Sequence, residues 1–256
     1  MTQQLFDRNL RSLRRDRAAR TGAELFLHDR AFDDCLDRLR GISRTYDRAL
    51  LVGCPSPAWP ERLNAFARHV DVVDPGKLFA SQSGGGQVEE DRHDFGEDRY
   101  DLCIAIGTLD TVNDLPVALQ LIRRSLRHDA PIMGAMAGGN SLETLRACLV
   151  EAGRKDGRVA ARTHPRIEAP SLAQLLSATG YSMPVVDVDR VKVRYASLED
   201  LVTDLRAMGA TSVLAQPGPA FSKAGAVLVQ QAFAARAQDG RTEEIVEILH
   251  FLGWNQ

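Results

Sequence analysis

The sequence lacks the features that mark a disulfide-stapled, membrane-spanning or nucleic-acid-binding protein. Its 256 residues include four cysteines, and no two of them form a CxxC pair. This spacing argues against a structural zinc site or a disulfide framework and predicts a reduced protein. No apolar run approaches the ~18 residues that a membrane span needs. The formal net charge of -2 provides no global field that would attract nucleic acid or an anionic membrane.

The length and composition are those of an ordinary globular protein. Hydrophobic residues make up 44% of the chain and charged residues 26%, which is typical of a soluble fold. A chain of this length buries most of its apolar surface and commonly stays a single domain. We expect one domain in three parts: a helical segment at 1–47, a nucleotide-binding core at 48–136, and an acceptor-side half with a helical insertion at 137–256.

Arginines are concentrated at the start of the chain. Within the first twenty residues they are Arg8, Arg11, Arg14, Arg15, Arg17 and Arg20. A transit peptide is also rich in arginine, but it contains few acids. Because Asp7 and Asp16 interrupt this cluster, we interpret it as a solvated helix within an amphipathic helical segment that spans residues 5–40.

Buried strands alternate with helices along the rest of the chain. Apolar runs predict strands at 49–52, 69–74, 100–109 and 130–139, a short one after residue 87, and two alternating, half-exposed strands at 185–195 and 244–252. Helical spacing predicts helices at 60–68, 115–126, 140–152, 171–179, 198–209 and 219–237. Asn140, with Glu143 three residues later, and Ser197 are the expected helix caps. The stretch at 81–87, "SQSGGGQ", is expected to be a flexible loop.

This order predicts an α/β fold with a Rossmann-like, mostly parallel, doubly wound sheet that has helices on both faces and an antiparallel edge strand. Ligands of such sheets bind beyond the carboxyl ends of the strands, where the strand order reverses. That rule brings together Gly53 to Pro57, Asp74, the acidic stretch at 89–91, and Gly107 to Thr111. Asp74 ends the second strand and is placed to accept hydrogen bonds from a ribose, although Asp-Pro-Gly is also a common turn.

The loop after the first strand does not match a dinucleotide-binding motif. A GxGxxG sequence is absent, since "GCPSPA" keeps one glycine of three. The other nucleotide-type ligand that this architecture binds is S-adenosylmethionine.

Several stretches, in order along the chain, resemble one branch of the class I methyltransferases (methyltransferase type 11). That branch contains the mitochondrial complex I assembly factors related to the malonyl-carrier-protein methyltransferase of the biotin pathway. The matching stretches are "LFDRNLRSLRRDRAAR", "YDLCIAIGTLDTVNDLP", "GAMAGGNSLETLRACL", "DLRAMG" and "FLGW". The resemblance covers nearly the whole chain and implies a seven-stranded sheet with its last strand antiparallel.

The resemblance also implies where the methyl donor binds. The first motif of the family matches at Gly53, its second-strand acid at Asp74, and its adenine-side acids at Glu89 and Asp91. Together with their neighbours in the crevice, the expected cofactor-binding residues are Gly53, Cys54, Asp74, Glu89, Asp91 and Gly107. No residue is assigned to catalysis and none to a metal.

Other motif positions depart from the family pattern. Leu51, Pro55 and Pro57 replace an acid and two glycines, and Asp110 and Thr111 replace a His-Trp pair. Proline fixes φ and removes an N–H donor, whereas glycine lets the backbone approach a ligand. Each lost polar contact costs roughly 1–3 kcal/mol, so two or three losses would move a micromolar site to the millimolar range. Either the prolines only rigidify the loop, or they leave a scaffold whose donor site is degenerate.

Two functional hypotheses follow. The first is a methyltransferase that modifies a protein subunit of a respiratory complex or a carrier-linked acid. The second is a non-catalytic, methyltransferase-like assembly factor for such a complex. The resemblance also includes arginine hydroxylation of a subunit, although no iron-ligand triad stands out. The expected location is the cytoplasm of a bacterium or the mitochondrial matrix of a eukaryote.

Overall fold

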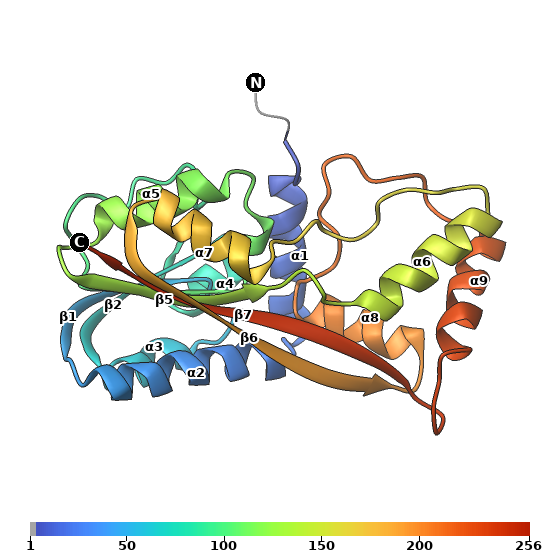
Figure 1. The fold of residues 1–256 in the computed structure, drawn as a ribbon, viewed down its shortest axis with the longest axis horizontal. Coiled ribbons are helices and arrows are strands. Elements are labelled where there is room, and N and C mark those ends of the chain that lie inside the picture. Colours follow the sequence, from blue (N-terminus) through green and yellow to red (C-terminus); the bar gives the residue numbers. More distant parts are fainter. Residues whose placement is uncertain (1–3) are drawn as a thin grey trace.

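Seven strands form a single sheet in the order β3-β2-β1-β4-β5-β7-β6 (Figure 1). The computed structural model describes residues 4–256. The strands are β1 (Tyr46–Val52), β2 (Ala67–Asp74), β3 (Gly86–Gln87), β4 (Leu102–Ile106), β5 (Ala130–Ala137), β6 (Tyr181–Tyr195) and β7 (Thr242–Asn255). Strands β1 to β5 are parallel, and β7 is antiparallel to both β5 and β6. The predicted mostly parallel sheet is confirmed. Its antiparallel strand is β7, which lies next to the edge strand β6.

Helices cover both faces of the sheet. They are α1 (Arg8–Thr21), α2 (Phe26–Ile42), α3 (Ala58–Leu63), α4 (Lys77–Gln82), α5 (Leu115–Ser125), α6 (Glu143–Lys155), α7 (Ala169–Ala178), α8 (Leu198–Ala207) and α9 (Lys223–Ala234). Figure 1 shows α5 and α7 above the sheet and α2 and α3 below it. Every residue of β4 is buried, as its continuous apolar run predicts for a central strand.

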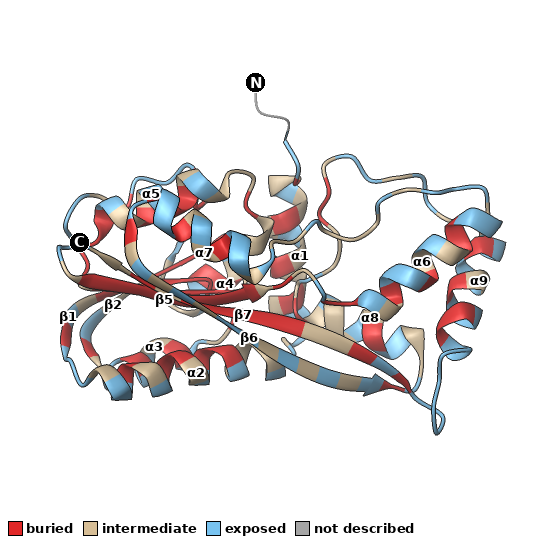
Figure 2. Cartoon of the chain, in the orientation of Figure 1, coloured by how far each residue is buried: buried red, intermediate tan, exposed pale blue. Residues whose placement is uncertain are grey.

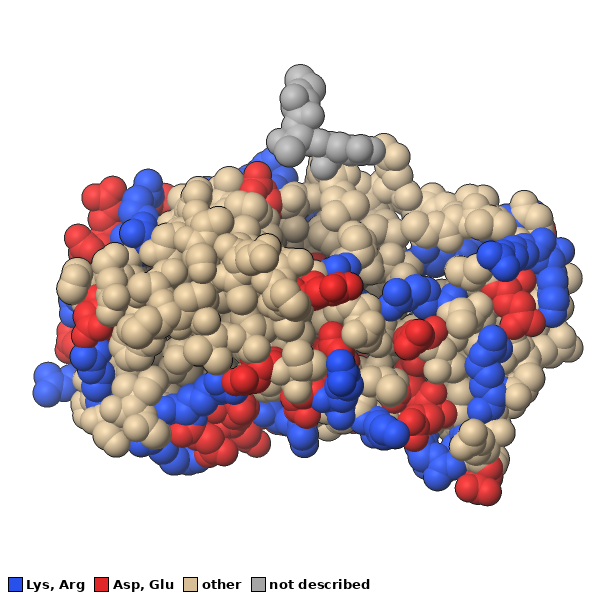
Figure 3. All heavy atoms as spheres, viewed as in Figure 1, with Lys and Arg blue, Asp and Glu red and all other residues tan. Residues whose placement is uncertain are grey.

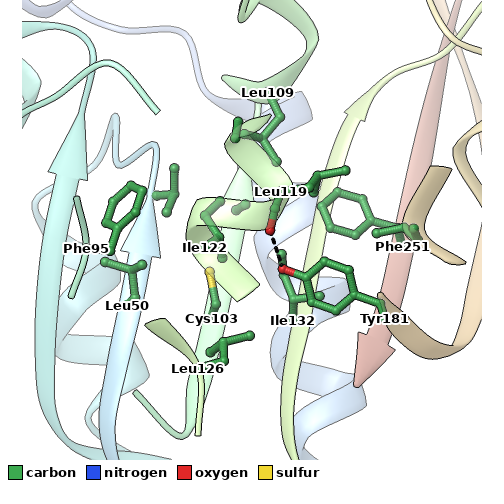
Figure 4. Close-up of a cluster of buried hydrophobic side chains, with 14 of the residues drawn as sticks. Leu50, Phe95, Cys103, Leu109, Leu119, Ile122, Leu126, Ile132, Tyr181 and Phe251 are labelled. Atoms are coloured by element: carbon green, nitrogen blue, oxygen red, sulfur yellow. Dashed lines mark hydrogen bonds between the residues drawn. The ribbon is translucent and has the colours of Figure 1, made fainter. Parts of the chain in front are cut away.

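Two apolar cores lie on the two sides of the sheet. One contains Leu119 and Ile122 of α5 with Leu172 and Leu176 of α7, and the other contains residues of α2 and α3 such as Trp59. Figure 4 shows the first core, in which the Tyr181 hydroxyl donates to the Leu119 carbonyl at 3.0 Å. This bond satisfies the polar end of an otherwise apolar side chain.

A second lobe extends from the far ends of β6 and β7. Residues 242–247 of β7 pair with β6 alone, beyond the last residue of β5. Helices α6, α8 and α9 pack there around a third apolar cluster that includes Phe233 and Tyr195. Figure 2 shows partly buried and exposed residues alternating along β6, which confirms the predicted half-exposed strand.

Several local predictions are wrong. The predicted helix at 60–68 ends at Leu63, and Ala67 already belongs to β2. The expected loop at 81–87 contains the end of α4 and the short strand β3. Residues 88–99 contain no strand. The predicted helix at 219–237 begins only at Lys223 and ends at Ala234.

The expected Asn140 cap of α6 does not form. Leu142 occupies the N-cap position in the left-handed region, with φ 58°. The Asn140 amide instead donates to Glu247 at 3.2 Å, and the Ser141 hydroxyl donates to the Glu247 carbonyl at 3.0 Å. Both side chains therefore fasten the β5–α6 turn to β7, which a local capping rule does not consider.

Charge is unevenly distributed over the surface. Figure 3 shows an uncharged area over α7, whose ten residues include no charged side chain, and many charges along the edge near β6 and α2. None of the helices in residues 4–256 combines the length and apolar composition that a membrane crossing requires.

The capping box of α8 provides a test of the fold. The Ser197 hydroxyl accepts from the Asp200 N–H, and the Asp200 carboxylate accepts from the Ser197 N–H. We expect Ser197→Ala to lower the free energy of unfolding by about 1 kcal/mol, the usual loss for an N-cap. Urea denaturation measures the change, with the exposed Thr203→Ala on the same helix as control. An equal effect of the two substitutions would contradict the cap.

Candidate functional site

The turn after β1 is packed against the end of β4. Gly53 has φ 78°, a conformation that favours glycine, and its N–H donates to the Val73 carbonyl at 2.8 Å. A Cβ at this position would lie 2.3 Å from the Ile106 carbonyl oxygen and 2.6 Å from Thr108 Cγ2. The open side of Gly53 therefore faces the protein's own Thr108.

The carboxylate of Asp74 is completely buried. Its Oδ1 accepts from Arg15 Nε at 2.7 Å and from the Gly76 N–H at 2.7 Å. Its Oδ2 accepts from Arg15 Nη2 at 2.6 Å and from the Cys54 N–H at 2.9 Å. An ionised carboxylate offers about four acceptor positions. All four positions of Asp74 are therefore filled: two by backbone N–H groups and two by Arg15 of α1.

Among the three neighbouring acids, Glu90 is the most deeply buried. It is completely buried, and its two oxygens accept from Arg11 at 2.7 and 2.9 Å. Burial raises the pKa of Glu90, but the adjacent Arg11 outweighs burial and the net shift is downward. Glu89 lies 3.4 Å from Arg11, and Asp91 binds Arg8 at 2.5 Å. The sequence prediction named Glu89 and Asp91 but omitted the most buried member.

Helix α1 supplies all of these cations, so the prediction of a solvated arginine helix is wrong. Arg11 and Arg15 are 2% and 5% exposed. Together with Arg8 they are separated by three and four residues, a spacing that places them on one helix face. We call Arg8, Arg11 and Arg15 the arginine ladder. Figure 1 shows α1 crossing beside the carboxyl end of β5, between the sheet and the second lobe.

The two prolines of the loop have different surroundings. Pro55 is buried, whereas Pro57 is exposed and precedes the first turn of α3 with φ -65°. The Cys54 thiol beside them donates to the Ser56 carbonyl at 3.2 Å. Pro57 therefore acts as a helix-start residue.

A cavity lies beside the ladder, and Arg11 and Arg15 line it. Gly107, with φ 63°, also lines it, and a Cβ there would be 2.9 Å from the His28 ring. The rest of the wall includes the ends of β4 and β5, α2, and α8 and β7 of the second lobe. Gly107 is the only one of the predicted cofactor residues that lines this cavity.

Two opposite charges in the cavity wall have no protein partner. The side chains of Asp110 and Arg166 both line the cavity, and neither makes a hydrogen bond or ion pair within residues 4–256. Burial lowers the pKa of Arg166, and nearby Asp110 opposes that shift. His164 is engaged, because its Nε2 accepts from the Val213 N–H at 2.8 Å. Asp110 and Arg166 are therefore the wall groups available to a charged ligand.

The six predicted cofactor residues thus separate into two groups. Gly53, Cys54, Asp74, Glu89 and Asp91 surround the ladder-filled side, which we call the donor half. Gly107 faces the cavity, which we call the acceptor half. Sequence reasoning missed Arg11, Arg15 and Glu90, although the arginine spacing was a visible signal. In residues 4–256, no three His, Cys, Asp or Glu side chains are grouped so that they could hold a metal ion.

Solved structures define the class of fold. A putative methyltransferase from Bacillus halodurans matches 86% of this chain and 98% of its own, with a TM-score of 0.61 and 10% identity. The N-methyltransferase NodS from Bradyrhizobium japonicum, in complex with S-adenosyl-L-homocysteine, matches 97% and 99%, with a TM-score of 0.51 and 15% identity. The chain has the class I methyltransferase fold.

Sequence relatives narrow the class. No protein-family model matches the chain. The chain is a homologue of proteins named arginine-hydroxylase NDUFAF5, mitochondrial: the mouse protein is 27% identical over 98% of this chain and 77% of its own length, and the human protein is 27% identical over 99% and 77%. A malonyl-[acyl-carrier protein] O-methyltransferase from Halorhodospira halophila is 26% identical over 62% of this chain and 54% of its own. The predicted branch is therefore confirmed.

His28 provides a pH test of the site. Burial, with a smaller contribution from Arg15, lowers the pKa of His28 to about 4, below the ~6.5 of an unfolded chain. Its stabilising contribution is complete above pH ~6.5 and is lost as the pH falls toward 4, because the unfolded state then binds the extra proton. At ~1.4 kcal/mol per pKa unit, the loss is about 3 kcal/mol.

We therefore expect His28→Gln to flatten the fall in unfolding free energy between pH ~6.5 and ~4. Denaturant unfolding at several pH values measures the slope. The exposed His128→Gln serves as control and should keep the wild-type slope. Parallel curves for the wild type and His28→Gln would show that His28 does not titrate in this way.

Proposed function

We propose that this chain is a methyltransferase-family protein that modifies a protein subunit during assembly of respiratory complex I, with S-adenosylmethionine as its donor. The observation that carries this proposal is the match to NDUFAF5 proteins over 98% of the chain. The class I sheet supports it, because ligands of such sheets bind where Gly53 and Asp74 lie. The NodS structure, with S-adenosyl-L-homocysteine bound, supports the choice of donor.

The donor half fits that nucleoside only when α1 is withdrawn. A ribose hydroxyl at this position would donate to Asp74, and all four hydrogen bonds that Asp74 accepts already come from the protein. The buried Glu90 is likewise occupied by Arg11. With α1 docked, the residues present do not fit the donor, and we derive no catalytic step through it.

The occupied carboxylates favour one alternative function. A methyltransferase-like scaffold that assists the same assembly without transferring a methyl group requires no access to Asp74. Under this alternative the arginine ladder is permanent structure. The two functions share the partner protein and differ only in whether the subunit is chemically altered.

The acceptor half is suited to a charged side chain. Asp110 offers an unpaired carboxylate in a largely apolar wall, where a charge-assisted hydrogen bond is stronger than in water. The name of the NDUFAF5 relatives supports an arginine side chain as the group that Asp110 receives. A carrier-linked acid, the substrate class named for the Halorhodospira relative, would instead pair with Arg166.

The proposed location is a reducing compartment, either the bacterial cytoplasm or the mitochondrial matrix. All four cysteines are buried and free, as expected where disulfides do not form. The word mitochondrial in the relatives' name supports the second location for a eukaryotic source.

Deletion of the gene in its host tests the function. We expect less assembled complex I on native gels and lower NADH-quinone oxidoreductase activity, both restored by the wild-type gene. Intact-mass spectrometry of the subunits should show the loss of one methyl group from one subunit. Normal assembly in the deletion strain would refute the proposal, and impaired assembly with unchanged subunit masses would favour the scaffold.

The acceptor can be tested with two charge-removing variants. Lysate of the deletion strain is supplemented with purified Asp110→Asn or Arg166→Gln protein, and the initial rate of subunit modification is measured. We expect Asp110→Asn to reduce the rate about 10- to 100-fold, because a hydrogen bond to a charged group contributes ~1.5–3 kcal/mol. Arg166→Gln, the matched control, should retain most of the rate. The reverse order would indicate an acidic acceptor.

A further inference from the structure

The arginine ladder occupies the same acids that the fold presents to a nucleoside. Arg15 binds Asp74 through both carboxylate oxygens, and Arg11 binds Glu90 in the same two-point manner. Arg11 also donates to the Thr108 carbonyl at 2.7 Å and to the Thr111 hydroxyl at 3.1 Å. The guanidinium of Arg11 therefore spans the donor half from the acidic stretch to the end of β4.

The pairing excludes a ligand because it uses hydrogen-bonding capacity as well as space. Two of the four donors on Asp74 are the backbone N–H groups of Cys54 and Gly76, which belong to the fixed turns after β1 and β2. Only the two bonds from Arg15 can be exchanged for other donors. Departure of Arg15 would free two acceptor positions on Asp74. A pair of neighbouring ribose hydroxyls supplies two O–H donors, which could fill both.

Helix α1 is attached in a way that permits such an exchange. Its buried residues are Arg11, Arg15 and Ala18, so ion pairs make up most of its buried contact with the donor half. The helix is also held at Asp16, which accepts from the Leu78 N–H at 2.8 Å, and at Leu10, which packs on the cluster of Phe6, Val213 and Leu214. The Coulombic gain of a buried ion pair is largely offset by desolvation of its charges. A connection at residues 22–25 joins α1 to α2, and Gly22 in it has φ 92° with no neighbouring atom near its Cβ position.

We propose that α1 is an autoinhibitory latch whose arginine ladder closes the donor half, and that a ribose-bearing donor binds by displacing Arg15 from Asp74 and Arg11 from Glu90. The proposal rests on the proposed function, because it takes a nucleoside donor as the ligand of this cleft. Ligand and latch compete for the same carboxylates, so each weakens the binding of the other.

The competition predicts that weakening the latch strengthens ligand binding. Isothermal titration calorimetry with S-adenosyl-L-homocysteine compares the wild type with Arg15→Gln. We expect the variant to bind at least about fivefold more tightly, at the lower end of the usual coupling between competing states. Arg20→Gln removes the same charge from the exposed end of the same helix and should bind like the wild type.

A measurement on the wild-type chain covers the case in which Arg15→Gln does not fold. Amide hydrogen exchange of residues 8–21 is followed with and without saturating S-adenosyl-L-homocysteine. The latch predicts faster exchange in α1 when the ligand is bound, because the helix has left its partners. Residues of α5, which lie outside the donor half, should exchange at the same rate in both samples.

The outcomes separate the latch from the proposed function. Binding to the wild type that protects α1, together with weaker binding to Arg15→Gln, would overturn the latch and leave the methyl-donor function intact, since the arginines would then hold the ligand. Absence of binding to the wild type and to a folded Arg15→Gln protein would overturn both. Tighter binding to Arg15→Gln with faster exchange in α1 would support both.

Discussion

The buried ion pair between Arg15 and Asp74 organises the centre of this molecule. It joins the first helix to the end of β2 with contacts of 2.7 and 2.6 Å, and the same carboxylate holds the backbone of two turns through Cys54 and Gly76. Removing either partner would leave an uncompensated charge in the interior. The pair therefore determines both the position of α1 and the shape of the donor half.

Much of the fold could be predicted because its signals are local. The uninterrupted apolar run of β4 requires a strand buried on both faces, and the alternation in β6 requires one that is half exposed. The Ser197 cap depends only on a residue three positions further on. Such patterns depend only on neighbours in sequence, so tertiary contacts did not change the elements that they predict.

The errors occurred where a distant residue decides the structure. The ladder pairs with acids that lie 59 to 83 positions away in sequence, so composition alone could not distinguish a buried arginine face from a solvated one. Nothing in the acidic stretch identifies Glu90 as its most buried member, because residues 88–99 form no regular element. Asn140 does not cap α6, and its side-chain amide donates to Glu247 on β7 instead.

The paired strands β6 and β7 connect the main sheet to the second lobe. One end of β7 lies against β5, and the other carries the α6–α8–α9 lobe. The cavity lies between these two parts. Ile248 and Val246 of β7 line it together with Leu205 of α8. Substitutions in the α6–α8–α9 lobe that change the twist of β6 and β7 would therefore change the width of the cavity while leaving the β1–β5 framework in place.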